Sequence, residues 1–317
     1  MTHRPVSTSD THAKPALGGI ICASLTPVST AGAIDIPRMA AHIRGLFDEG
    51  CSFVSPFGST GEGASFSVRE KIRALEALTA AGIDPGRLIP ATMSAALDDA
   101  VEIVRFGAEA GSRAVLVAPP FYYGAASQGG IADFFAMLAD RLGGTLPTEI
   151  VLYHIPQMTR IPFGVELVRQ LIARHGDRIA GIKDSTGDRD HTLMLQRTFP
   201  ELRIFTGDDR VLPDLLAAGG AGMIGGLPNI VARDLCTIYG DPTGPGTAQL
   251  RERAALRIQA VDDFSGIPAL KAIKARIIGD PAWRVTLPPL RALDSATTAE
   301  LLGRFERSEF PFPAESA

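Results

Sequence analysis

Short apolar runs rich in β-branched residues alternate along the chain with longer stretches in which apolar residues recur every three or four positions. The alternation starts near residue 17 and continues to about residue 240. Eight short runs can be distinguished, at residues 20–25, 51–55, 87–92, 113–118, 149–153, 178–183, 202–206 and 221–225. Between them, the clearest helical candidates are residues 67–81, 97–110 and 164–175.

Strand and helix in regular alternation is typical of a parallel sheet, because each parallel pair of strands needs a crossover connection. Eight repeats predict an α/β fold, a closed (β/α)8 TIM barrel over residues 17–240, rather than an open doubly wound sheet. The first strand–helix turn also lacks G-x-G-x-x-G, which argues against dinucleotide binding. A segment rich in Pro and Gly at 241–246 breaks the pattern, and helices are predicted at 249–261, 268–278 and 295–306. We therefore expect a small C-terminal helical domain over residues 241–317.

Composition and charge narrow the class of protein. The chain has 317 residues, of which 45% are apolar, and a formal net charge of −4. A mildly acidic chain without a basic cluster lacks the surface that binds nucleic acid or an anionic membrane. No apolar run reaches the roughly 18 residues needed to span a bilayer. Residues 1–16 are polar, which predicts a disordered arm and no signal peptide. Three cysteines without a CxxC motif favour reduced thiols in a cytoplasmic protein.

The ends of the predicted strands are where the active site of a barrel lies. The run at 178–183 ends in Lys183, which shares a face with Ile179 and Gly181 if the residues alternate strictly. On the barrel interior, burial favours the neutral amine, which can attack a ketone and form a Schiff base. The alternative is a lysine whose stem packs while its ammonium group reaches solvent. The neighbouring strand ends in Tyr153, which points into the same cavity by the same alternation and offers a phenol for proton transfer. A tyrosine of the core with a single hydrogen bond is the alternative there.

The loop that follows the second predicted strand reads Gly58-Ser59-Thr60-Gly61-Glu62-Gly63. Its glycines permit close backbone approach, and its successive N–H groups can bind an anion. The two hydroxyl groups can bind a carboxylate or relay protons to Tyr153. A flexible loop capped by Ser and Thr is the simpler interpretation.

Together these features resemble the dihydrodipicolinate synthase / N-acetylneuraminate lyase superfamily, from about residue 18 to the C-terminal helices. The motifs that show the resemblance occur in the family's order: Leu25-Thr26-Pro27, the loop just described, Tyr122-Tyr123, Tyr153-x-x-Pro156, Gly181-Ile182-Lys183-Asp184, Gly207-Asp208-Asp209 and Gly219-Gly220-Ala221-Gly222. The resemblance implies a lyase that forms a Schiff base with pyruvate or a related 2-oxo acid and needs no external cofactor.

The same resemblance assigns roles to individual residues. It implies that Lys183 is the Schiff-base lysine and Tyr153 the proton-transfer tyrosine. Gly58, Ser59 and Thr60 match the segment that holds the keto-acid carboxylate, and Thr60 also matches the hydroxyl relay. Tyr123 matches a tyrosine that crosses a tight dimer interface to complete a neighbour's relay. Ile224 matches a position whose backbone carbonyl faces the substrate. The expected assembly is a homotetramer built as a dimer of dimers.

Two departures bear on the substrate. Synthases of the family place an arginine two residues after the proline of Tyr-x-x-Pro, where it binds the carboxylate of the aldehyde partner, and here Met158 occupies that position. Arg160 lies two residues later, and His154 replaces the usual asparagine beside the tyrosine. This favours an aldolase or dehydratase acting on a 2-keto-3-deoxy sugar acid, with an aldehyde as a candidate partner of pyruvate. Dihydrodipicolinate synthesis is the first alternative, and a non-catalytic 2-oxo-acid-binding protein is the second.

Metal and phosphate sites are weaker interpretations. The candidate metal ligands are His154, Asp184, Asp208, Asp209 and Glu62, but no HxH or HExxH motif is present and we expect no metal. His42, His175 and His191 are expected on helix surfaces. The glycine-rich segment 219–226 contains no Lys or Arg to pair with phosphate, so its glycines are expected to line the cavity instead.

Overall fold

The computed structural model describes residues 16–314. The arm expected over residues 1–16 therefore lies, apart from Ala16, outside the described residues, and so does the end of the tail at 315–317.

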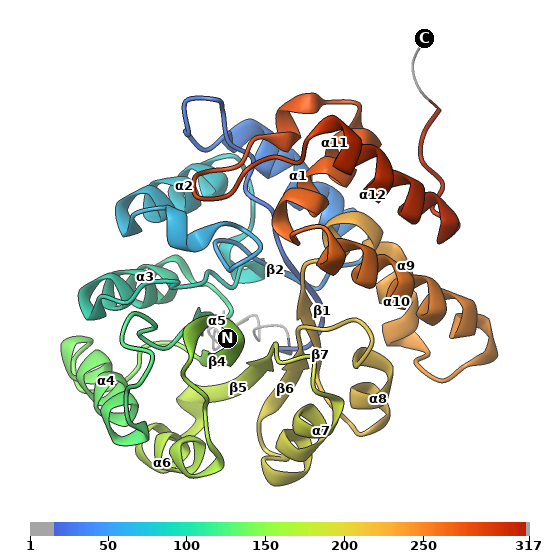
Figure 1. Cartoon of the computed structure of the whole chain (residues 1–317). Coiled ribbons are helices and arrows are strands. Elements are labelled where there is room, and N and C mark those ends of the chain that lie inside the picture. Colours follow the sequence, from blue (N-terminus) through green and yellow to red (C-terminus); the bar gives the residue numbers. More distant parts are fainter. Residues whose placement is uncertain (1–15, 315–317) are drawn as a thin grey trace, which may run out of the picture.

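Seven parallel strands form one sheet that curves into a barrel (Figure 1). In chain order, the strands are β1 (Gly19–Ala23), β2 (Phe53–Ser55), β3 (Val115–Val117), β4 (Ile150–His154), β5 (Ile179–Asp184), β6 (Arg203–Thr206) and β7 (Gly222–Gly225). Their order in the sheet is β2-β1-β7-β6-β5-β4-β3, so β2 and β3 are its two edges.

The run predicted as a strand at 87–92 lies between these two edges but is not a regular strand. It makes isolated parallel bridges, Val54 with Leu88 on one side and Ala91 with Leu116 on the other. The physical reason is Pro90, which has no backbone N–H to donate and interrupts the ladder. Its carbonyl still accepts from the Leu116 N–H, at 3.0 Å, so the segment closes the barrel. The (β/α)8 architecture is confirmed, with one strand position reduced to bridges.

Helices surround the barrel (Figure 1). They are α1 (Ile36–Asp48), α2 (Val68–Ala80), α3 (Leu97–Ala110), α4 (Gln128–Arg141), the short α5 (Pro156–Thr159), α6 (Val165–His175), α7 (Arg189–Thr198), α8 (Leu212–Ala217), α9 (Pro228–Gly240), α10 (Ala248–Asp263), α11 (Ile267–Ile278) and α12 (Ser295–Arg307). The helices predicted at 67–81, 97–110, 164–175, 249–261, 268–278 and 295–306 are all present within a few residues of those bounds. At α2, for example, Ser67 and Glu70 form a capping box that fixes the start of the helix.

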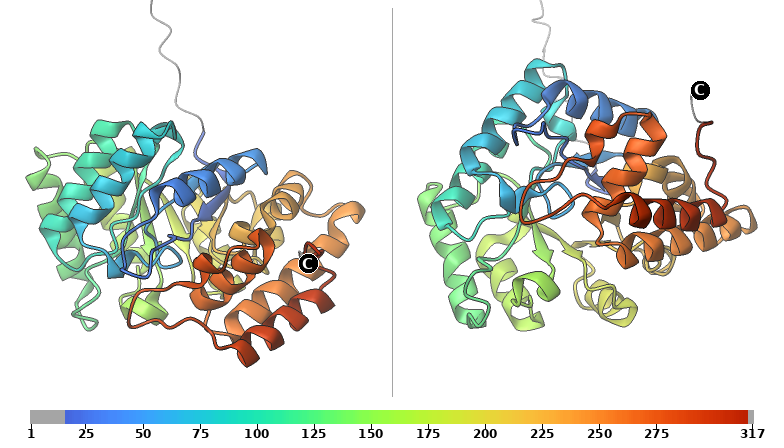
Figure 2. Two further views of the ribbon diagram at one scale, coloured as in Figure 1. Left: turned by 90° about the horizontal axis from the view of Figure 1, so that it is seen from above. Right: turned by 45° about the horizontal axis from the view of Figure 1, so that its top comes forward.

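Apolar side chains pack in an inner and an outer layer. Inside the barrel, residues such as Leu116, Val151 and Phe205 fill the centre. The outer layer packs the strands against the helices, and on one side it continues without a break into α10, α11 and α12. Figure 2 shows these C-terminal helices gathered beside α1 and α9. The division into two domains at residue 240 stays a prediction, since the core is shared across that boundary.

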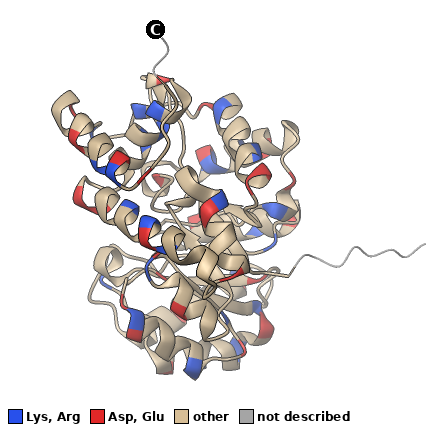
Figure 3. Ribbon diagram, turned by 90° about the vertical axis from the view of Figure 1, so that its right-hand side faces the viewer, with Lys and Arg blue, Asp and Glu red and all other residues tan. Residues whose placement is uncertain are grey.

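The surface carries charges of both signs. On the side shown in Figure 3, basic and acidic residues are interspersed along the helices. Among the described residues, no helix is both long enough and apolar enough to span a membrane.

Candidate functional site

Lys183 and Tyr153 lie side by side at the carboxyl ends of adjacent strands. The two residues are direct partners in the β4–β5 register. The Lys183 Nζ atom lies 4.0 Å from the centre of the Tyr153 ring, and both side chains are buried. The prediction that they converge on the barrel interior is therefore confirmed.

The strict alternation expected along β5 fails at the start of this strand. Ile179 packs in the outer layer, together with Ile182, whereas Ala180 packs against the inner layer. The cause is a register irregularity, because Ile150 pairs with Ile179 but Val151 pairs with Gly181. Gly181, which shares a face with Lys183, has no room for a side chain. A side chain there would overlap the Arg203 backbone of β6, so this glycine permits the close approach of the two strands.

The amine of Lys183 differs from the other lysines in the described part of the chain. Lys71 donates to the Thr92 carbonyl at 2.7 Å, Lys271 to Val285 at 2.7 Å and Lys274 to Asn229 at 3.2 Å. Within residues 16–314, the Lys183 amine donates to no protein acceptor and lies over the Tyr153 ring. A buried amine without a structural partner is available for chemistry, whereas the other three amines anchor backbone.

The loop at 58–63 meets Tyr153 through Ser59. The Ser59 Oγ atom lies 3.0 Å from the Tyr153 hydroxyl oxygen. The backbone N–H groups of Ser59 and Thr60 donate to no acceptor among the described residues, which leaves them free for an anion. The loop is shaped by close packing, because a side chain at Gly61 would lie 2.8 Å from the Ser24 carbonyl oxygen. Nothing lies within 4 Å of the position a side chain would take at Gly58.

The second hydroxyl of the loop faces β7 rather than Tyr153. A Cβ atom built on Gly226 would lie 3.2 Å from Thr60 Oγ1, so Thr60 packs directly beyond the end of β7. Ile224 lies on β7, buried in the inner layer. Ser59 thus contacts Tyr153, and Thr60 lies beyond the end of β7, the strand that carries Ile224. The hydroxyl in contact with Tyr153 belongs to Ser59, and the relay role that the resemblance implies for Thr60 stays a prediction.

Tyr123 is not part of this cluster within one chain. Its side chain is 75% exposed on the loop after β3, and its ring packs edge-on against Tyr122, with centroids 5.2 Å apart. Met158 is also exposed, on α5. Arg160 ends that short helix with a positive φ of 57°, and its side chain lies against Gly124. The aliphatic stem of Arg160 therefore lies beside the loop that carries Tyr123.

A buried network lies on the outer side of the same two strands. The Asp184 carboxylate accepts from His154 Nδ1 at 3.2 Å, His191 Nδ1 at 3.1 Å and Thr192 Oγ1 at 2.6 Å. Burial alone would raise the pKa of Asp184, but these hydrogen bonds outweigh burial and hold that pKa well below its usual value. The hydrogen bond with Asp184 raises the pKa of His191.

Three of these side chains, His154, Asp184 and His191, have donor atoms close enough to hold a metal ion. However, the Asp184 oxygens already accept hydrogen bonds from several donors, including the Thr186 hydroxyl, so a metal would have to displace them. The other proposed ligands lie elsewhere. Glu62 pairs with Lys271, and Asp208 pairs with Arg210.

The prediction that His42, His175 and His191 lie on helix surfaces is wrong for His42. His42 is buried, bonds to Asn229 at 2.8 Å and packs edge-on against Trp283, and burial lowers its pKa to about 3. His191 bonds to Asp184. His175 alone among these three has no side-chain hydrogen bond to a residue of the described chain. Helical spacing shows which residues share a face but not which face packs on the barrel, which explains the error at His42.

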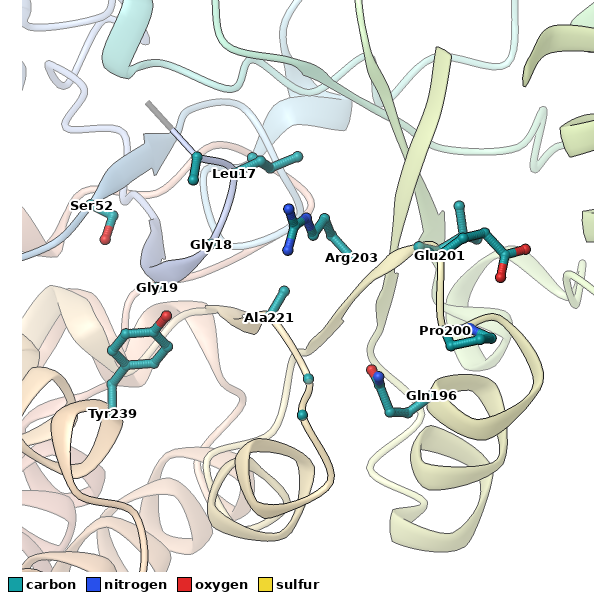
Figure 4. Close-up of a pocket in the computed structure, with 14 residues that line it drawn as sticks. Leu17, Gly18, Gly19, Ser52, Gln196, Pro200, Glu201, Arg203, Ala221 and Tyr239 are labelled. Atoms are coloured by element: carbon teal, nitrogen blue, oxygen red, sulfur yellow. The ribbon is translucent and has the colours of Figure 1, made fainter. Parts of the chain in front are cut away.

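A cavity of about 350 Å³ opens at the opposite end of the barrel (Figure 4). It is lined where strands begin, by residues such as Gly18, Ser52, Arg203, Ala221 and Tyr239. Part of the glycine-rich segment, Gly219 and Gly220, lies here and not beside Lys183, because it precedes β7. The later glycines Gly225 and Gly226 lie at the carboxyl end of β7, where Gly226 lies beside Thr60.

The chain is similar in sequence to known lyases of one family. The sequence model of the Dihydrodipicolinate synthetase family matches residues 16–294. The chain is 37% identical to a protein described as an uncharacterized DapA-like lyase from Chloroflexus aurantiacus, over 91% of this chain and 96% of that protein. It is 30% identical to a 4-hydroxy-tetrahydrodipicolinate synthase from Methanoculleus marisnigri, over 89% and 96%.

Solved structures agree in fold. Dihydrodipicolinate synthase from Agrobacterium tumefaciens superimposes with a TM-score of 0.85 at 31% identity, covering 91% of this chain and 98% of that one. A 2-keto-3-deoxygluconate aldolase from Sulfolobus gives a TM-score of 0.82 at 21% identity, with 92% and 96% coverage, and so supports the fold alone.

Proposed function

The chain belongs to the dihydrodipicolinate synthetase family, and from that premise we propose that it is a class I lyase in which Lys183 forms a Schiff base with pyruvate or a 2-keto-3-deoxy sugar acid. The observation that supports this most directly is the Lys183 amine, which is buried beside the Tyr153 ring and has no structural acceptor in the described chain. A purely structural lysine would be expected to anchor a carbonyl, as Lys71 and Lys271 do.

The chemistry follows from the order of groups in the cavity. The Lys183 amine attacks the ketone carbon, and the former carbonyl oxygen is protonated to give a carbinolamine. Tyr153 passes the protons, with the Ser59 hydroxyl at 3.0 Å as the next group of the relay, and water leaves. The resulting iminium accepts the electron pair when a carbon–carbon bond breaks or a proton is lost, which gives an enamine. No external cofactor is required for these steps.

The carboxylate of the 2-oxo acid is proposed to bind at the loop of Ser59 and Thr60. Their N–H groups have no acceptor in the described chain, and they lie between Tyr153 and the end of β7. Gly58 leaves open space beside them, and the Ile224 carbonyl is proposed to face the substrate from β7. Fixing the carboxylate there orients the ketone for attack by Lys183.

The residue two positions after Pro156 bears on the second substrate. Met158, exposed on α5, offers no charge where a synthase of the family binds its aldehyde's carboxylate. This favours cleavage or dehydration of a keto-deoxy sugar acid. Synthesis of 4-hydroxy-tetrahydrodipicolinate is a second candidate because the Methanoculleus relative has that name.

Assembly and location are also proposals. The exposed pair of Tyr122 and Tyr123 supports contact with a second copy, and we propose a homotetramer built as a dimer of dimers. All three cysteines are unpaired, which supports a reducing cytoplasm.

The test is reductive trapping. The protein is incubated with pyruvate and borohydride, and the adduct is mapped by peptide mass spectrometry. Among the lysines at residues 16–314, we expect an adduct on Lys183 alone, because only its amine is both buried beside Tyr153 and free of a backbone acceptor. Lys71, Lys271 and Lys274 are internal controls that should remain unmodified.

Two substitutions complete the test. Lys183→Ala should abolish trapping and turnover, whereas Tyr153→Phe should retain a residual rate, lower by roughly 100-fold or more, because general acid–base catalysis contributes about that factor. Near-normal turnover in folded Lys183→Ala would refute the mechanism. Saturable pyruvate binding without any adduct would favour the non-catalytic binding protein.

A further inference from the structure

Glu62 belongs to the loop that carries Ser59 and Thr60, but its side chain points away from the cavity into the protein. Its φ is 55°, in the left-handed region that residues other than glycine seldom adopt. Its carboxylate forms an ion pair with Lys271 of α11, and both side chains are fully buried. Such a backbone conformation persists only when surrounding contacts hold it.

The ion pair also binds the segment that follows α11. Glu62 Oε2 accepts from the Leu287 N–H at 2.8 Å, and the Lys271 amine donates to the Val285 carbonyl at 2.7 Å. This segment, orange-red in Figure 1, reaches from α11 across to the side of the barrel that carries β2 and α2. The loop at Glu62 and two nearby parts of the C-terminal region, both far from it in sequence, therefore meet at one buried ion pair.

A single backbone hydrogen bond links Glu62 to the residue that contacts Tyr153. The Glu62 N–H donates to the Ser59 carbonyl at 3.0 Å, and Ser59 in turn contacts Tyr153. From the other side, α11 reaches Thr60 through Gly226, where an added Cβ would lie 3.2 Å from both Leu270 and Thr60. The loop is thus held by the ion pair with Lys271, and Leu270, the neighbour of Lys271 on α11, packs against Gly226 where that glycine lies beside Thr60.

We propose that Glu62 and Lys271 are a positioning pair through which the C-terminal helices hold the Ser59–Thr60 segment in the geometry that binds the carboxylate of the 2-oxo acid. The proposal rests on the proposed function. A buried ion pair contributes little net stability compared with apolar residues of similar size, and fixing one geometry is the best-attested use of such a pair. Its effect should therefore fall on substrate affinity more than on the reactivity of Lys183.

The experiment compares pyruvate saturation of borohydride trapping in the full-length protein. The main variant is the double substitution Glu62→Gln with Lys271→Met, which removes both charges and leaves no unpaired ion in the interior. We expect the pyruvate concentration for half-maximal trapping to rise about tenfold, with a limiting rate at saturation within about threefold of the wild type. Glu62→Gln alone leaves Lys271 charged and unpaired, so it serves only as a comparison if it folds.

A matched control is the pair of Arg257 and Asp234, another ion pair with a buried arginine, between α9 and α10 and away from the loop. Arg257→Met with Asp234→Asn should leave both the half-saturating concentration and the limiting rate unchanged, whatever its effect on Tm. An unchanged half-saturation in the folded Glu62→Gln/Lys271→Met protein would overturn the positioning role while leaving the Schiff base intact. Absence of trapping in the wild type would instead refute the proposed function itself.

Discussion

Asp209, just beyond β6, is a buried carboxylate in an unfavourable setting. It is 4% exposed, and no other residue of the described chain donates a hydrogen bond to either carboxylate oxygen. Burial, and then the neighbouring Asp208 carboxylate, raise the pKa of Asp209 well above its ordinary value, which its own backbone N–H offsets only in part. The folded protein therefore holds this proton more tightly than the unfolded chain does.

The consequence is a stability that depends on pH. Because the folded-state pKa is raised, the full stability is present below the unfolded value near 3.9 and is lost as pH rises toward the folded value. Asp209→Asn removes this loss, so we expect its Tm to match the wild type near pH 4 and to exceed it by roughly 2 °C or more at pH 8. Thermal unfolding of both proteins across that range is the measurement. A variant equally or less stable at pH 8 would contradict the assignment.

Single residues also show how far sequence reasoning extends. Lys183 and Tyr153 can be predicted to converge because side chains alternate along strands and neighbouring parallel strands end together. The contact of Ser59 with Tyr153 cannot be predicted in this way. It depends on a loop held by Glu62, whose carboxylate is bound by a backbone N–H at position 287. No local pattern encodes a contact over such a separation.

At the scale of elements, β4, β5 and α7 form one unit around Asp184. Tyr153 and Lys183 face the cavity, and the next residues along the two strands, His154 and Asp184, face outward and bond to each other. His191 of α7 completes the network. The network joins the helix to the two strand ends that present the proposed catalytic pair.

The charges of this unit give a second pH dependence. Because the pKa of Asp184 is lowered in the folded protein, its ionised carboxylate stabilises the fold above about pH 4, and this stabilisation is lost in stronger acid. Because the pKa of His191 is raised in the folded protein, its protonated ring stabilises the fold below about pH 6.5. This stabilisation is lost as the pH rises through the pKa of His191 in the folded state. We expect His191→Asn to cost about 1 kcal/mol near pH 5.5, a fall of roughly 2 °C in Tm, and less at pH 8.5. A loss that is equal at both pH values would show that the ion pair is not its cause.

Elements also show where periodicity misleads. Seven of the eight predicted strands are present. A short run of apolar, β-branched residues between two amphipathic helices is too short for a buried helix and fits a buried strand. The run at 87–92 has the same composition, but Pro90 reduces it to two bridges, and the irregularity opposite Ile150 shifts the start of β5. Both deviations depend on the partner strand as well as on the run itself.

At the scale of the whole molecule, Tyr123 lies outside the cluster of Lys183, Tyr153 and Ser59 in its own chain. That side chain lies on the surface, packed edge-on against Tyr122, and together they form an exposed aromatic pair on the loop after β3. Large apolar side chains exposed side by side on a loop indicate a surface that another molecule covers. We expect that molecule to be a second copy whose cavity receives Tyr123.

Mixed assemblies test this directly. Tyr123→Phe protein and Lys183→Ala protein are each expected to have low activity. In a mixed dimer, the subunit with an intact Lys183 receives an intact Tyr123 from its partner, so one of its two sites is complete. Random mixing gives half mixed dimers, and activity should recover to about a quarter of the wild type. Subunits with different affinity tags, refolded together and purified through both tags, would show that mixed assemblies form, and cross-linking within these assemblies would identify the mixed dimers. Their failure to regain activity would mean that Tyr123 does not act across the interface, whereas recovery would require each complete site to draw on two chains.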